Sequence, residues 1–243
     1  MGLNRHPGRS FIARNGLPQG IDDVLHYAAF LRHEAGLSDE PPIDLELIFE
    51  HFGIPPPVYA SLPGQQAILL NDETGVMLIN EDDPTTRQRF SQAHELMERL
   101  FAAHEKSLKA GNRGIRFRDR SKEDLCEQGA AALLLPRSSF LPRLAGLGTT
   151  LQAASTLASL YHASLLATLF QMVRYGPGAH ALAMWRHALK PKQVQDLPSP
   201  DQIPLFDANL IPSPQEELRV WWAVSTERLP NSFIPKHKSI PRE

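Results

Sequence analysis

The segment His94-Glu95-Leu96-Met97-Glu98 brings together side chains that can bind a metal and one that can move a proton. On a helix, His94 and Glu98 are four residues apart and share a face, so both can reach one ion. Glu95 lies about 100° around the helix from His94, where its carboxylate can take a proton from water at the metal. This arrangement follows the His-Glu-x-x-His zinc-binding motif, with glutamate at the position of the second histidine. A motif this short also arises by chance on amphipathic helices, so a metal site needs support from the rest of the chain.

The helix that carries this motif is expected to begin at Asp83, which can cap it ahead of Pro84, and to continue to about Glu105. Two short apolar runs precede it, at 67–70 and 76–80, on either side of a turn-forming stretch. They predict a β-hairpin next to the motif helix.

A second helix is expected to open at Ser121, with Asp124 in the reciprocal position of a capping box, and to end at Pro136. The remaining patterns predict helices at 21–35, 45–52, 150–160 and 164–175, and strands at 179–187 and 218–224. The residues at 179–187 fit a short helix equally well. Together these elements predict an α+β fold that is mainly helical.

The composition is that of an ordinary globular protein, with 42% hydrophobic and 21% charged residues among 243. The formal net charge of -2 gives no overall basic field to draw the protein onto nucleic acid or an anionic membrane. No run reaches the roughly 18 apolar residues of a membrane-spanning helix, and we expect a cytoplasmic location. Cys126 is the only cysteine, which excludes intrachain disulfides and cysteine-built zinc sites. Any metal is therefore expected to be held by His, Asp or Glu.

Two stretches resemble the signatures of the ImmA/IrrE family of bacterial metallopeptidases. Residues 87–96 (RQRFSQAHEL) are similar to the segment that leads into the family's active-site helix. Residues 123–136 (EDLCEQGAAALLLP) are similar to its second signature, Glu-x-x-Ala-Asn/Asp-x-Phe-Ala-Ala-x-Leu-Leu-Met-Pro. The resemblance implies a zincin-like fold and a third metal ligand at the glutamate that opens the second signature, here Glu123. It also implies that Glu127, one turn later, helps to orient a ligand.

Three departures from the family pattern matter, at Glu98, Glu127 and Gly129. With His94, Glu98 and Glu123 as ligands, two carboxylates would neutralise a divalent ion, whereas two histidines and one carboxylate leave a positive charge. A less positive centre lowers the pKa of bound water less, so peptidase activity is expected to be weaker or absent. Carboxylate-rich ligand sets also shift the preference from zinc, the expected metal, towards harder ions such as manganese. A site without metal is an open alternative.

Other interpretations of single residues remain. His104, ten residues after His94, has the spacing of the third ligand in metzincins, but Phe101 stands where those enzymes bend the chain at a glycine. Without that bend, His104 is rotated about 80° from the face of His94 and is not expected to be a ligand. Asp124 is already explained by its place in a capping box. Glu123 could equally be a solvated acid in the first turn of a helix.

The predicted organisation has four parts: a flexible tail at 1–20, a metallopeptidase domain at 21–145, a helix-turn-helix-like segment at 146–176 and a proline-rich region at 177–243. Family members often carry a helix-turn-helix after the peptidase domain, and the resemblance implies one here. Residues 164–172 offer no Arg, Lys or Asn to base edges or phosphates, which favours a packing unit over a DNA reader. The end of the chain at Glu243, without an obvious closing element, is consistent with truncation.

The resemblance implies a metal-dependent endopeptidase that cleaves a helix-turn-helix repressor or antitoxin in a stress or mobile-element response. Glu95 would be the general base, and His94, Glu98 and Glu123 would hold the metal. Glu98 also motivates an alternative, a catalytically silent regulatory module that binds a repressor or nucleic acid through the inherited scaffold.

Overall fold

The computed structural model describes residues 6–195, 215–226, 229 and 234–239. These residues belong to two compact units, one ending at Met172 and the other beginning at Val173. Every candidate site residue lies in the first unit.

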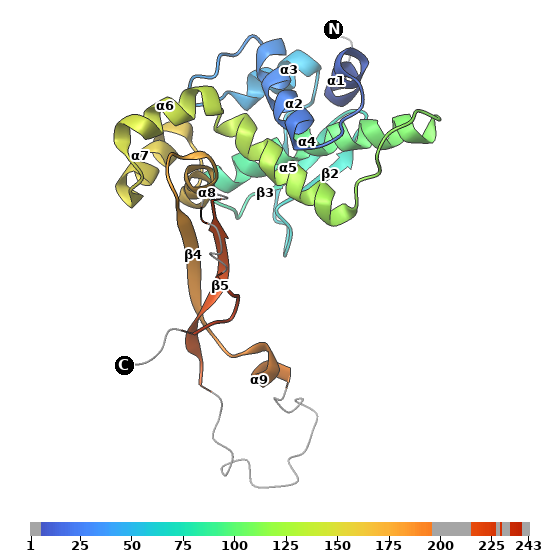
Figure 1. Cartoon of the computed structure of the whole chain (residues 1–243). Coiled ribbons are helices and arrows are strands. Elements are labelled where there is room, and N and C mark those ends of the chain that lie inside the picture. Colours follow the sequence, from blue (N-terminus) through green and yellow to red (C-terminus); the bar gives the residue numbers. More distant parts are fainter. Residues whose placement is uncertain (1–5, 196–214, 227–228, 230–233, 240–243) are drawn as a thin grey trace, which may run out of the picture. The chain divides into compact units, whose positions relative to one another are not determined.

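The first unit is mainly helical and contains one small sheet (Figure 1). Its helices are α1 (Pro7–Asn15), α2 (Ile21–Glu34), α3 (Leu45–Phe52), α4 (Thr85–Lys109), α5 (Asp119–Leu134), α6 (Arg137–Leu147), α7 (Leu151–Tyr161) and α8 (Leu165–Tyr175), the last of which crosses the unit boundary. Its strands are β1 (Val58–Ala60), β2 (Ala67–Asn71) and β3 (Val76–Asn80). They are ordered β1-β3-β2, with β1 parallel and β2 antiparallel to β3. The predicted mainly helical α+β fold and the hairpin are both confirmed.

α4 is the central element of this unit and packs against α1, α2, α3, α5 and the strands β2 and β3. Its inward positions Ala93, Leu96, Met97 and Leu100 are fully buried, at the three- and four-residue spacing of one helix face. The buried Tyr27 hydroxyl of α2 donates a hydrogen bond to the Leu96 carbonyl at 3.2 Å. These contacts fix the rotation of α4 and therefore the directions of the motif side chains.

α5 approaches α2 and α4 closely because Gly129 has no side chain. A Cβ atom at Gly129 would lie 2.5 Å from Met97 Sδ and 2.7 Å from Val24 Cγ1. Those distances are too short for any larger residue unless the neighbours move. The departure from the family's phenylalanine at this position thus has a physical reason, since Met97 and Val24 fill the volume that a side chain would need.

The expected flexible tail at 1–20 is wrong for residues 7–15, which form α1. Pro7 is the first helical residue, a position that suits its fixed φ angle. Phe11 is 1% exposed, and Gly8 lets α1 touch the main chain of α4, where a Cβ would come within 2.4 Å of a carbonyl oxygen. A helix that packs through one large apolar side chain and one glycine leaves little hydrophobic periodicity to detect.

The predicted start of the second helix is also wrong. α5 begins at Asp119, two residues before Ser121, and the N-cap residue is Arg118, whose side chain makes no capping hydrogen bond. Asp124 is exposed and lies in the second turn. The capping box at Ser121 and Asp124 therefore does not form, and α6 after Pro136 is a helix that the sequence patterns did not indicate.

α7 and α8 are joined by a short turn and are bent by 116° relative to each other. His162 ends α7 with a left-handed backbone at φ 50. The Ser164 hydroxyl then accepts a hydrogen bond from the Ala167 N–H at 3.1 Å and begins α8. Two helices at this angle with a turn of this length have the arrangement of a helix-turn-helix.

The second unit contains an antiparallel pair of strands, β4 (Ala181–Ala188) and β5 (Glu217–Ser225), and the short helix α9 (Pro191–Gln195). Of the two alternatives for 179–187, the strand is correct. The proline-rich stretch 196–214 lies outside the described residues. Within the described part of the chain, no single helix is long and apolar enough to cross a membrane.

Candidate metal centre

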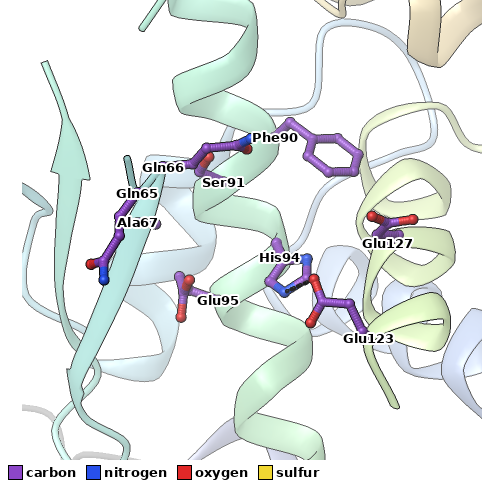
Figure 2. A pocket seen from close by; sticks show the side chains of 9 residues that line it. All are labelled: Gln65, Gln66, Ala67, Phe90, Ser91, His94, Glu95, Glu123 and Glu127. Carbon is purple, nitrogen blue, oxygen red and sulfur yellow. Dashed lines mark ion pairs between the residues drawn. The ribbon is translucent and has the colours of Figure 1, made fainter. Parts of the chain in front are cut away.

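His94 of α4 lies between two carboxylates. Its Nε2 atom is 4.0 Å from Glu98 Oε1, one turn along the same helix, and 3.6 Å from Glu123 Oε1 on α5. Figure 2 shows the imidazole and the Glu123 carboxylate pointing towards each other from the two helices. The three residues that the motif and the family signature single out as ligands are therefore neighbours in the fold.

A pocket of about 300 Å³ opens beside His94 (Figure 2). Residues 65–67, which lead into β2, form one wall. α4 contributes His94 and Glu95, and α5 contributes Glu123 and Glu127. The pocket thus extends from the start of β2 to the candidate ligands His94 and Glu123 and to Glu95.

Glu95 is almost fully buried, at 7% exposure, and Figure 2 shows it on the side of α4 nearer Ala67. Burial raises the pKa of Glu95 to about 7, with further contributions from the negative charges of Glu98 and Glu123 and an opposing one from Lys122. A carboxyl group with a pKa near neutrality can both accept and donate a proton at cellular pH. Its environment therefore suits proton transfer.

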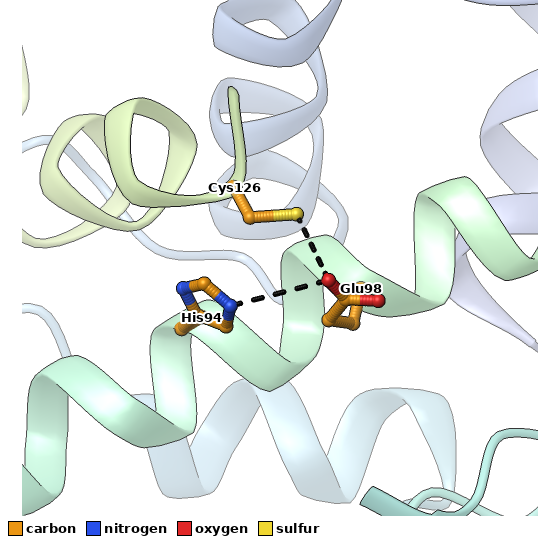
Figure 3. Close-up of side chains that lie close together, drawn as sticks. All are labelled: His94, Glu98 and Cys126. Carbon is orange, nitrogen blue, oxygen red and sulfur yellow. Dashed lines mark hydrogen bonds and ion pairs between the residues drawn. The ribbon is translucent and has the colours of Figure 1, made fainter. Parts of the chain in front are cut away.

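The two oxygens of Glu98 have different partners. Oε2 forms an ion pair with Lys122 Nζ at 2.6 Å. Oε1 faces His94 and accepts a hydrogen bond from the Cys126 thiol at 3.5 Å (Figure 3). Burial lowers the pKa of Lys122, but the hydrogen bond and charge of Glu98 raise it more, so the ammonium group remains charged. Glu98 is not among the residues that line the pocket.

Lys122 and Cys126 both contact the candidate ligand Glu98, and sequence reasoning missed both. They are four residues apart on α5 and so share a face, but the face of α4 that they meet depends on how the two helices pack. Donor atoms of His94, Glu98 and Cys126 lie within 4.8 Å of one another, so the single cysteine lies beside the candidate ligands. Burial, followed by the charge of Glu98, raises the pKa of the Cys126 thiol. The sulfur therefore stays protonated and acts as a donor to Glu98.

The other candidates have clear positions. Glu127 lines the pocket one turn after Glu123 (Figure 2), whereas Asp124 is exposed and does not line it. His104 is 1% exposed, and its Nε2 atom lies 2.8 Å from the Ile115 carbonyl oxygen. His104 thus anchors the loop after α4 and takes no part in the pocket.

The residues present fit a divalent cation. The imidazole nitrogen of His94 is within 4.0 Å of a carboxylate oxygen from Glu98 and one from Glu123. Imidazole and carboxylate are ligands for zinc and for harder ions such as manganese.

The candidate site lies in the part of the chain that is similar to a known protein family. Residues 58–172 match the model of a peptidase family described as the IrrE N-terminal-like domain. No curated protein matches the chain. Eleven chains among solved structures do, including a Mycobacterium tuberculosis transcriptional regulator with a TM-score of 0.51 and 17% sequence identity. That match covers 75% of this chain and only 57% of the regulator's, and at this identity it shows the fold alone.

The matched segment begins with β1 and includes the hairpin, α4, α5 and every candidate site residue. Both signature stretches fall inside it, and its fold is the zincin-like α+β fold that they imply. Residues 58–172 therefore match an IrrE N-terminal-like domain, the domain of the family that the two signature stretches resemble.

Proposed function

We propose that this chain is a metal-dependent endopeptidase of the ImmA/IrrE type. The observation that carries the proposal is the buried Glu95, with its pKa raised to about 7, in one pocket with His94 and Glu123. A buried carboxylate with a shifted pKa costs stability, and such groups cluster at functional sites. Its place beside a metal-binding constellation gives it a chemical role.

In this proposal His94, Glu98 and Glu123 hold the metal. When bound, a divalent cation would acidify a water molecule and polarise the scissile carbonyl group. Glu95 would accept the proton of the attacking water and pass it to the leaving amide nitrogen. Glu127, on the pocket wall, would help to keep the ligand side chains oriented.

β2 offers a place for an extended substrate. It is an edge strand in the order β1-β3-β2, and the residues leading into it, 65–67, line the pocket. An extended peptide can add to a free strand edge through main-chain hydrogen bonds. Such pairing would bring a peptide bond alongside His94 and Glu95.

For the substrate we propose a helix-turn-helix repressor or antitoxin, as the family resemblance implies. Cleavage would release the genes that it controls in a stress or mobile-element response. Leu165 and Leu166, at the start of α8, are exposed. Apolar side chains there favour contact with a protein surface over contact with DNA phosphates.

The test is cleavage of a repressor encoded next to this gene, with added zinc or manganese and with a chelator. Wild-type protein should cleave only with metal, and Glu95→Gln should lose at least about 100-fold in rate because an amide cannot accept the proton. Zinc binding should persist in that variant. Asp124→Asn, which removes an exposed acid of α5 outside the pocket, is the matched control and should remain active. Cleavage that survives Glu95→Gln would refute the general-base role.

A second candidate function is a catalytically silent regulatory module that binds a repressor or nucleic acid. One observation favours it, since Glu98 already has a cationic partner in Lys122. Metal analysis after exposure to zinc and manganese separates the two functions. A stoichiometric metal supports the enzyme, and persistent absence supports the module. Proteolysis gained only on Glu98→His would show that the altered position alone had silenced the site.

A further inference from the structure

Lys122 directly precedes Glu123 in the chain, but its side chain contacts the other candidate carboxylate, Glu98. The distance from Lys122 Nζ to Glu98 Oε2 is 2.6 Å. Only 25% of the lysine side chain and 22% of the glutamate side chain are exposed. Solvent and salt screen such a partly enclosed pair less than a surface pair.

We propose that Lys122 is a built-in counter-cation that sets the charge of the metal site through Glu98. The inference rests on the proposed function, in which His94, Glu98 and Glu123 hold a divalent cation. Lys122 is not itself a ligand, because an ammonium group has no lone pair to offer. It is a positioning residue that acts through the carboxylate it binds.

The ion pair between Lys122 and Glu98 changes the net charge of the candidate metal site. Glu98 and Glu123 contribute two negative charges and Lys122 contributes one positive charge, so the three sum to one negative charge. Two neutral histidines and one carboxylate, the usual set in this family, have the same sum. Lys122 thus offsets the charge that Glu98 adds, and a bound divalent cation keeps a net positive charge.

The geometry lets the ion pair and a metal share Glu98. Lys122 contacts Oε2, whereas Oε1 is turned towards His94 Nε2 at 4.0 Å. A ligating carboxylate commonly binds the metal through one oxygen while the other accepts a hydrogen bond. By binding Oε2, Lys122 therefore keeps Oε1 of Glu98 on the side of His94.

A measurable consequence concerns metal affinity. The ammonium group cancels part of the attraction between Glu98 and a divalent cation, because opposite charges a few ångströms apart interact strongly in a partly enclosed site. Loss of this positive charge should make the site bind metal more tightly.

The experiment measures the zinc affinity of the full chain by competition with a chromophoric chelator, with zinc ion alone as the probe. Lys122→Met and Lys122→Gln should each lower the zinc dissociation constant by about tenfold or more. Lys122→Arg keeps the charge and should stay within about threefold of wild type. Arg120→Met removes the same charge from an exposed position on α5 outside the pocket and should change the constant less than about twofold.

A double-mutant cycle tests whether Lys122 acts through Glu98. In a Glu98→Gln background, Lys122→Met should change zinc affinity by less than about threefold, since no carboxylate is released. An equal gain in both backgrounds would overturn the inference, because the lysine would then repel the metal directly.

The outcomes also separate this inference from the function on which it rests. Equal zinc affinity of wild type and Lys122→Met would overturn the role of Lys122 and leave the metal site intact. Failure of wild type and all variants to bind zinc or manganese would overturn both. Thermal unfolding of each variant checks that it is folded. If Lys122→Met does not fold, Lys122→Gln provides a second neutral side chain at the same position.

Discussion

Two carboxylates three residues apart on α4 have contrasting surroundings. Glu95 is buried, and that burial together with the charges of Glu98 and Glu123 raises its pKa to about 7. Glu98 instead forms an ion pair with the Lys122 ammonium group and accepts a hydrogen bond from the Cys126 thiol. Acids held in such different environments can divide the roles of proton carrier and ionised group within one site. The residue spacing predicts which face each acid occupies, whereas the division of roles depends on α5.

Glu95→Gln is expected to stabilise the metal-free protein at pH 8. The folded-state pKa of Glu95, about 7, lies above its ordinary value of 4.5. The contribution of Glu95 to the stability of the wild-type protein is therefore fully present below pH 4.5 and is lost as the pH rises through 7. Glutamine has no charge to bury, so the variant should exceed wild type by about 2 kcal/mol in free energy of unfolding at pH 8 and by little at pH 4.5.

Chemical denaturation with a chelator present measures this difference. Glu105→Gln removes an exposed acid from the same helix and serves as the control, with no pH-dependent gain expected. A gain for Glu95→Gln of equal size at both pH values would point to packing instead of charge.

The contact of α5 with α2 and α4 depends on Gly129. Gly129→Ala should lower the free energy of unfolding by about 1–3 kcal/mol, because the added methyl group would overlap Met97 and Val24. Zinc binding should weaken as well, since α5 carries Glu123. Both effects are measured by urea denaturation and by titration with zinc.

The matched control for that prediction is Gly146→Ala on α6. A Cβ at Gly146 meets no atom within 4 Å, so the substitution should raise the free energy of unfolding by up to about 1 kcal/mol through helix propensity. If the two substitutions changed stability in the same direction, close packing at Gly129 would not be what limits the helix spacing.

How well an element could be predicted follows from how it packs. α3 could be predicted because four apolar residues, all buried, repeat at helical spacing behind an Asp44 cap. α1 could not, because it packs through Phe11 and the missing side chain of Gly8. The start of α5 was misplaced because tertiary packing can extend a helix past a favourable capping residue such as Ser121.

The first unit contains the complete candidate site and the two clusters of buried apolar residues. A fragment of residues 1–176, which keeps α8 whole, is expected to unfold in one cooperative transition and to bind zinc within about threefold of the full chain's affinity. Circular dichroism during thermal unfolding and the chelator competition measure the two properties. Loss of zinc affinity in a folded fragment would mean that the second unit contributes to the site.

For the whole molecule, periodic apolar patterns were enough to predict the mainly helical α+β fold and its hairpin. Motif spacing singled out His94 and Glu98, and the family signature singled out Glu123. Lys122 could not be found in this way, because its partner lies on another helix and their pairing depends on the rotation and spacing of both. The charge of the site is thus a property of the packed helices.

The missing side chain at Gly129 also has an evolutionary consequence. A Cβ at Gly129 would overlap Met97 and Val24, and no atom of the residues at positions 94, 98 and 123 is among those it would meet first. Descendants of one ancestor can then exchange a histidine for a glutamate with a nearby lysine without rebuilding the helices that carry them. In this chain metal preference can drift through changes at the donor positions, whereas any residue larger than glycine at position 129 requires Met97 and Val24 to move.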